Sequence, residues 1–173
     1  MVQDLWVYAL SSAAFAAGSD DGGAPKTTKT TKECKGGQVW DKKKRKCVDA
    51  ERGMFSDDSL YENARELAYD GQYTHAIKLL HLAANPQDPR ILNYLGFANR
   101  KAGNTELGMK YYRQALAINP DYILARSYMG QAMALSGDLD GAWKQLAEIA
   151  DRGGVQTWSY RALKGSLSGN ATY

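Results

Sequence analysis

Residues 89–120 read PRILNYLGFANRKAGNTELGMKYYRQALAINP, and this stretch decides the fold. Its apolar side chains predict two amphipathic helices of about a dozen residues joined by a short turn. Gly103 can adopt the left-handed conformation that ends the first helix, and Pro120 stops the second. Gly96 and Gly108 leave room for the two helices to approach closely. The side chains expected to fill the seam are Leu95, Tyr112 and Leu116.

Turn glycines recur along the chain at Gly71, Gly103 and Gly137, with separations of 32 and 34 residues. A period of this length is typical of stacked helical hairpins. The order of residue types in residues 89–120 (a large residue, Leu-Gly, Gly, a small residue, an aromatic, Ala-Leu and Pro) resembles the tetratricopeptide repeat family. The resemblance implies an all-α fold, a short right-handed superhelix of three hairpins at about 57–88, 89–122 and 123–154, with a capping helix at about 155–167.

The two flanking units match the family pattern less closely than the middle one. At the same offsets, the first unit has Leu60, Ala64, Gly71, Ala76, Leu80 and Ala83, and the third has Met129, Gly130, Gly137, Ala142, Leu146 and Ile149. Terminal units of a stacked array depart in this way because one side has no neighbour. The capping helix is expected to cover the open end with a stripe of Val155, Trp158, Ala162 and Leu163.

The chain begins with an apolar, small-residue stretch, residues 1–17, that resembles the end of a secretory signal peptide. Ala14 and Ala16 supply the small residues that signal peptidase requires, so cleavage is expected after Ala16 or Ala17. No Lys or Arg precedes the run, and Asp4 stands where a positive charge is wanted, so the alternative is a frayed cytosolic terminus. A working leader predicts an exported bacterial protein, periplasmic or secreted; a leader without function predicts a cytoplasmic one. The run is too short to span a bilayer.

The only two cysteines, Cys34 and Cys47, enclose a compact segment with a basic run of Lys42, Lys43, Lys44, Arg45 and Lys46. In a chain that resembles exported proteins, this spacing predicts a structural disulfide worth about 3 kcal/mol by chain entropy. A zinc site needs about four ligands, and His75 and His81 lie far along the chain, so no metal is expected. We interpret the N-terminal part as a flexible linker at 18–33 and a basic disulfide loop at 34–52, followed by a repeat domain at 53–173.

The net charge of +3 comes from the N-terminal part, because residues 1–49 hold 9 Lys/Arg and 6 Asp/Glu whereas residues 50–173 hold 13 of each. The balanced repeats offer no basic face, which argues against a nucleic-acid partner. Because the apolar periodicity starts near Asp57, the repeats are expected to fold without the arm. We interpret the paired acids Asp57–Asp58 and Asp138 with Asp140 as helix caps.

The sequence contains no nucleophile motif, no phosphate loop and no metal-spaced His/Glu set. These absences predict a non-enzymatic protein without cofactors. The tetratricopeptide resemblance implies instead a scaffold that binds a peptide or protein in a concave groove lined by the first helix of each hairpin.

Carried over position by position, the groove residues implied by the resemblance are Tyr61, Arg65, Asn93, Phe97, Arg100, Ser127 and Gln131. Aromatic rings with Asn and Arg suit an extended peptide, because rings supply contact area while Asn and Arg bond its backbone and carboxylates. An alternative is that Tyr61 and Phe97 only pack between hairpins. The alternative function is an envelope- or anion-binding module that acts through the basic loop 34–47.

Overall fold

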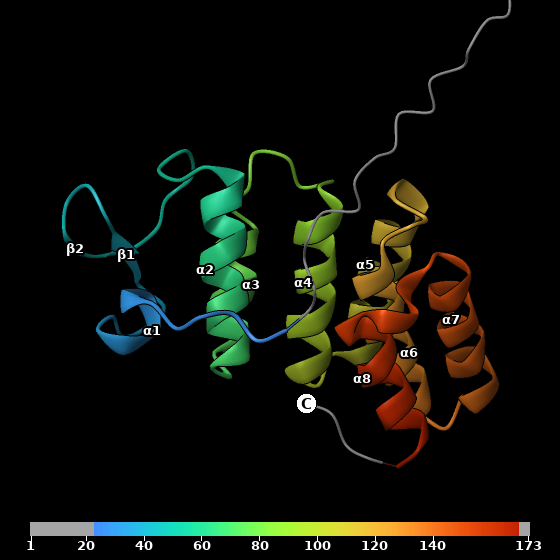
Figure 1. The fold of residues 1–173 in the computed structure, drawn as a ribbon. Coiled ribbons are helices and arrows are strands. Elements are labelled where there is room, and N and C mark those ends of the chain that lie inside the picture. The colour runs from blue at the N-terminus through green and yellow to red at the C-terminus, as the bar shows by residue number, and fades with distance from the viewer. Residues whose placement is uncertain (1–22, 170–173) are drawn as a thin grey trace, which may run out of the picture.

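The computed structural model describes residues 23–169 of the 173-residue chain, so the signal-peptide-like residues 1–17 lie outside the described part. A row of packed helices follows a small N-terminal module (Figure 1). The module comprises α1 (Lys29–Lys32), β1 (Val39–Asp41) and β2 (Lys46–Val48). The row comprises α2 (Asp57–Tyr69), α3 (Tyr73–Leu80), α4 (Pro89–Lys101), α5 (Thr105–Ile118), α6 (Ile123–Leu135), α7 (Leu139–Asp151), the 3-10 turn η1 (Gly154–Gln156) and α8 (Trp158–Leu167).

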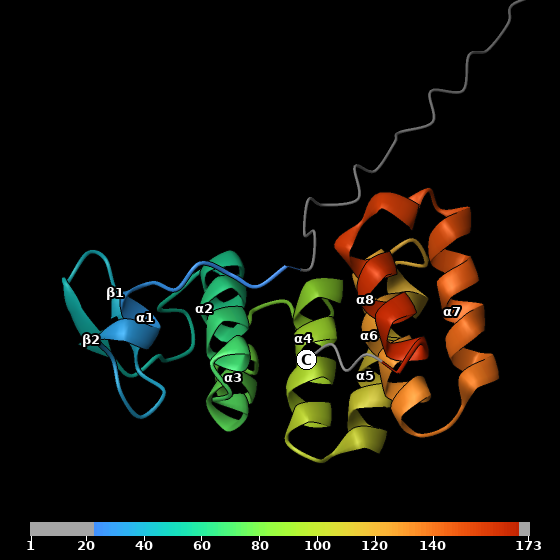
Figure 2. The same cartoon turned by 60° about the horizontal axis from the view of Figure 1, so that its bottom comes forward.

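Helices α2–α3, α4–α5 and α6–α7 form three antiparallel hairpins, and α8 packs against α6 and α7 (Figure 1). This arrangement confirms the predicted all-α repeat fold. Figure 2 shows the β1–β2 hairpin and α7 at opposite ends of the molecule. None of the helices between residues 23 and 169 has the length and apolar character needed to cross a membrane.

Local cap and turn residues determine where the helices of the middle hairpin begin and end. Asp88 caps α4, because its carboxylate Oδ1 accepts a hydrogen bond from the Arg90 N–H at 2.8 Å, and Pro89 occupies the first turn. The helix ends at Lys101, and the turn that follows contains Gly103, whose φ of 95° lies in the left-handed region that glycine reaches without strain. α5 begins two residues later.

Helices α4 and α5 touch most closely at Gly96 and Gly108. A Cβ atom on Gly108 would lie 2.7 Å from the Gly96 carbonyl oxygen and 3.0 Å from the Arg100 Cβ. A Cβ atom on Gly96 would meet the Tyr112 ring at 2.6 Å. Tyr112 itself has no exposed surface and occupies the seam, as predicted.

Gly108→Ala is therefore expected to lower the free energy of unfolding by about 1–3 kcal/mol, because backbone must shift to admit the methyl group. At an unconstrained helix position, the same change would stabilise by about 1 kcal/mol. Urea denaturation measures the difference, with the exposed Lys110→Ala as control. A stabilising effect of Gly108→Ala would contradict the close approach.

The ends of the array differ from the sequence-based expectation in two places. The segment predicted as one helix from residue 155 is broken, because Thr157 caps α8 by accepting the Tyr160 N–H at 3.2 Å. Val155 therefore lies in η1 with 44% of its surface exposed and does not belong to the buried stripe of α8. Asp57 is likewise not the cap of α2, a role that Ser56 fills.

Asp57 instead fixes the chain that leaves α3. Its carboxylate accepts hydrogen bonds from the backbone N–H groups of Ala84 and Asn85, at 2.7 and 2.8 Å. Asp138 does cap α7, by accepting the Gly141 N–H at 2.9 Å, as the sequence predicted.

The predicted disulfide between Cys34 and Cys47 is confirmed. It links Cys34, which follows α1, to Cys47 in β2. Strands β1 and β2 form an antiparallel hairpin, in which Val39 lies opposite Val48 and Trp40 opposite Cys47. Only a closed loop was expected from the sequence here, because strands of three residues are too short to show an alternating pattern.

Residues 23–33, part of the stretch interpreted as a flexible linker, lie against α2. The Glu66 carboxylate accepts hydrogen bonds from the Thr28 N–H at 2.6 Å, the Thr28 hydroxyl at 2.7 Å and the Thr31 N–H at 3.2 Å, and also from the Thr31 hydroxyl. Thr30 donates to the Asn63 side-chain oxygen at 2.6 Å. Val39 is 1% exposed and belongs to the same apolar cluster as the helices. The arm therefore contacts the repeats, and folding of the repeats without the arm stays a prediction.

Candidate binding surface

Helix α4 lies at the centre of the molecule and is covered on every side. Residues 91–100 are all buried, because α4 packs against α2, α3, α5 and α6. Most of these residues are apolar, but Asn93, Asn99 and Arg100 are not. Asn99 donates to the Leu95 carbonyl oxygen at 2.8 Å within the helix. Asn93 and Arg100 are the groups that need an explanation.

Aromatic rings fill the space on the inner side of the first helices. The ring of Phe97 lies 4.9 Å from that of Tyr128 and 5.9 Å from that of Tyr94. Tyr94 in turn lies 5.4 Å from Tyr61. Two of the predicted groove residues, Tyr61 and Phe97, thus make ring contacts between hairpins and are 8% and 3% exposed. This geometry fits the packing alternative, and their role in binding stays a prediction.

Hydroxyl groups tie the same rings together. The hydroxyls of Tyr69 and Tyr128 lie 2.9 Å apart, and those of Tyr94 and Tyr128 lie 3.5 Å apart. Burial, reinforced by the neighbouring tyrosines, raises the pKa of Tyr128 well above its ordinary value. The half-buried Arg65 donates from Nε to the Tyr94 hydroxyl at 2.9 Å, and it also bonds the Gly23 carbonyl oxygen.

The capping helix covers the predicted groove residues of the third unit. The Ser127 hydroxyl donates to the carbonyl oxygen of Ser159 in α8 at 2.7 Å. Gln131 donates to the Ser127 hydroxyl at 3.1 Å, and both side chains are buried. The groove predicted from the resemblance is therefore occupied by α8 at this end. We leave Ser127 and Gln131 out of the candidate site for this reason.

Asn93 has no exposed surface, and neither its side-chain nitrogen nor its oxygen has a hydrogen-bond partner among the described residues. Burying an amide without a partner costs about 1–3 kcal/mol. Buried polar groups that remain unsatisfied are rare, and each calls for an explanation, such as a functional role, stored strain or a bound water or ion. Asn93 is thus a functional candidate on physical grounds.

Arg100 is also incompletely paired, although it is only 8% exposed. Its Nε lies 3.5 Å from the Tyr112 hydroxyl, at the outer limit of a hydrogen bond, and its guanidinium carbon lies 5.7 Å from the centre of the Phe97 ring. The terminal Nη2 has no partner among residues 23–169. A buried cation without an anion is strongly unfavourable, and a ligand that supplies an anion would relieve it.

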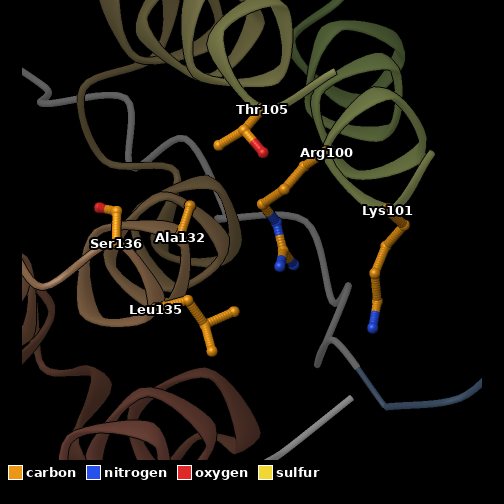
Figure 3. Close-up of a pocket in the computed structure, with 6 residues that line it drawn as sticks. All are labelled: Arg100, Lys101, Thr105, Ala132, Leu135 and Ser136. Carbon is orange, nitrogen blue, oxygen red and sulfur yellow. The ribbon is translucent and has the colours of Figure 1, made fainter. Parts of the chain in front are cut away.

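The Arg100 side chain enters a hollow of about 310 Å³ between the C-terminal ends of α4 and α6 (Figure 3). The hollow is lined by Arg100, Lys101, Thr105, Ala132, Leu135 and Ser136. Loss of hydration, with the charge of Arg100 as a second cause, lowers the pKa of Lys101 below its ordinary value. No periodic pattern in the sequence indicates this hollow, because it forms between the ends of two different hairpins. Its one sign in the sequence is Leu135, a large apolar residue two positions before the turn glycine Gly137.

The basic run Lys42, Lys43, Lys44, Arg45 and Lys46 lies at the end of the β1–β2 hairpin, and all five residues are exposed. Lys44 pairs with Asp41 at 3.8 Å, and no other cation of the run has an ion pair in the described structure. No group of three or more His, Cys, Asp and Glu side chains within residues 23–169 is placed to hold a metal ion.

Comparison with known proteins supports the repeat assignment. The tetratricopeptide repeat family model matches residues 89–122, which form the α4–α5 hairpin and the turn that follows it. No curated protein and no solved structure matches the chain. The same hairpin geometry is repeated before and after the matched unit, which supports an array of tetratricopeptide-type repeats.

Proposed function

We propose that this protein is a non-enzymatic scaffold that binds a polypeptide segment along the inner face of α4. Tetratricopeptide repeats generally mediate protein–protein interaction, which supports the coarse assignment. The observation that supports this particular face is the presence of two buried polar groups without complete partners, Asn93 and Arg100, on one helix.

The spacing of these two groups suits an extended chain. Asn93 and Arg100 are seven residues apart, which is about two helical turns or roughly 10 Å along α4. Three residues of an extended peptide span about the same length. The Asn93 amide could then bond one peptide group, while Arg100 pairs with an acidic group three residues along. Because Asn93 has no exposed surface, the side chains that cover it must move when the ligand binds.

Asn93→Leu gives a sharp test, because the two side chains have similar volume and the change removes both unpaired polar atoms. We expect it to raise the free energy of unfolding by about 1 kcal/mol. We expect the affinity for a partner recovered by pull-down to fall about thirtyfold, corresponding to about 2 kcal/mol. Urea denaturation and isothermal titration calorimetry measure the two effects.

Two controls separate this site from its rivals. Lys144→Ala changes an exposed residue of α7 and should leave stability and affinity unchanged. Replacing the cations at 42–46 with glutamine tests the basic loop. If the glutamine chain loses the partner while Asn93→Leu retains it, the site is the basic loop and not α4. Phe97→Ala is a poor test, because Phe97 is part of the aromatic packing.

A further inference from the structure

The hollow that contains Arg100 adjoins a second hollow of about 630 Å³, and the two share Thr105 and Ser136 in their linings. The second is lined by Thr105, Glu106, Leu107, Met109, Lys110, Arg113 and Ser136. We call the two adjoining hollows together the edge groove; their lining residues come from the end of α4, from α5 and from the α6–α7 turn. The edge groove leaves the inner face of the array and lies among the interhelical turns.

The edge groove is strongly basic. It is lined by four cations, Arg100, Lys101, Lys110 and Arg113, and by a single acid, Glu106. None of the four cations takes part in an ion pair within the described structure. Residues 50–173 as a whole hold 13 Lys/Arg and 13 Asp/Glu, so this excess of cations is local.

The protein itself offsets only part of this charge. The last carbonyl groups of α4 carry a partial negative charge equivalent to about half a unit, and they lie beside Arg100 and Lys101. In the first hollow, the two positive charges of Arg100 and Lys101 are offset only by this partial negative charge. The Nη2 of Arg100 is buried, unpaired and directed into the space between α4 and α6 (Figure 3). An oxygen anion of a ligand would supply the missing hydrogen-bond partner of Nη2.

Apolar side chains stand beside the cations. Leu135 is 72% exposed and Leu107 is 41% exposed, and each lines one of the two hollows. Met109 adds a flexible apolar contact in the second hollow. A lining that combines cations with exposed apolar side chains suits a chain that carries both carboxylates and apolar residues.

We propose that the edge groove binds an acidic polypeptide segment with interspersed apolar residues, and that Arg100 pairs with one of its carboxylates. This inference rests on the proposed function, because Arg100 also ends the polar row on α4, and it specifies the chemistry of the partner. The carboxylate has two sources, an Asp or Glu side chain or the C-terminus of the partner chain.

The experiment uses a fluorescein-labelled octapeptide that alternates glutamate and leucine, with a free or an amidated C-terminus, and a twin with glutamine in place of glutamate. Binding to the full chain is measured by fluorescence anisotropy at two salt concentrations. We expect the glutamate peptide to bind at least tenfold more tightly than its twin, and more weakly at higher salt. Loss of binding on amidation assigns the C-terminal carboxylate, and equal binding of both forms assigns a side chain.

Arg100→Met keeps the aliphatic packing and removes the charge, and Lys144→Met is its matched control on α7. We expect Arg100→Met to weaken binding about tenfold without lowering the melting temperature, and Lys144→Met to change neither. Leu135→Glu, at an exposed position, should weaken binding by charge repulsion. Equal binding of the glutamate and glutamine peptides would overturn the proposal, and so would equal effects of the two Met variants on binding. Loss of peptide binding only in the chain with glutamine at residues 42–46 would also overturn it.

Failure of this inference and failure of the proposed function give different results. If Asn93→Leu loses the recovered partner while Arg100→Met and Leu135→Glu retain it, binding on α4 stands and the edge groove is not used. If all three variants retain the partner, the proposed face itself is wrong.

Discussion

Tyr128→Ala is expected to lower the free energy of unfolding by about 3–5 kcal/mol, the usual cost of removing a large buried aromatic ring. Tyr128 is 1% exposed, and its ring contacts those of Phe97, Tyr112 and Trp158. It therefore joins the second hairpin, the third hairpin and the capping helix. Urea denaturation followed by circular dichroism measures the loss.

Tyr128→Phe separates the ring from its hydroxyl. It removes only the hydrogen bonds to the Tyr69 and Tyr94 hydroxyls, so we expect a loss of about 1 kcal/mol. If Tyr128→Ala cost no more than Tyr128→Phe, the aromatic cluster would not be the element that holds the hairpins together.

Removal of residues 1–52 is expected to destabilise the remaining chain by on the order of 4 kcal/mol. Burial of Val39 contributes about 2 kcal/mol, and the hydrogen bonds from Thr28 and Thr31 to the Glu66 carboxylate contribute a similar amount. The chain of residues 53–173 should therefore unfold at lower urea concentration than the full chain.

Glu66→Gln in the full chain is the matched control for this truncation. It retains the module and the size of the side chain but removes the charge that four donors approach, so it should lose only about 1–2 kcal/mol. Equal stability of residues 53–173 and the full chain would show that the module contributes nothing to the stability of the repeats.

The hairpins could be predicted from the sequence because their determinants are local. Gly96, Gly103, Gly108 and Tyr112 lie within one hairpin, and each acts on a neighbour less than one repeat away. The same reasoning placed the disulfide, because only two cysteines were available.

The docking of the N-terminal module could not be predicted in this way. Thr28, Thr30 and Thr31 belong to a polar, repetitive stretch without apolar periodicity, and their partners Asn63 and Glu66 lie more than 30 residues away. Glu66 itself looks like an ordinary surface residue of an amphipathic helix. Hydrogen bonds between distant polar segments leave no periodic trace in a sequence.

The candidate site was predictable only in part. The resemblance implied Asn93 and Arg100 as groove residues, and both have buried polar atoms without partners, but it also selected Ser127 and Gln131, which α8 covers. Their environment depends on where the capping helix packs, a tertiary feature that position-by-position transfer does not include. The edge groove was missed for the same reason, because its walls come from the ends of separate hairpins.

The most direct test of the α4 surface is nuclear magnetic resonance of the ¹⁵N-labelled chain with and without the recovered partner. The side-chain amide of Asn93 and the Nε–H of Arg100 report on the two groups that are proposed to contact the ligand. We predict that these signals shift most, while the backbone amides of β1 and β2 keep their positions. Unchanged Asn93 and Arg100 signals, together with shifts confined to residues 39–48, would contradict binding on α4.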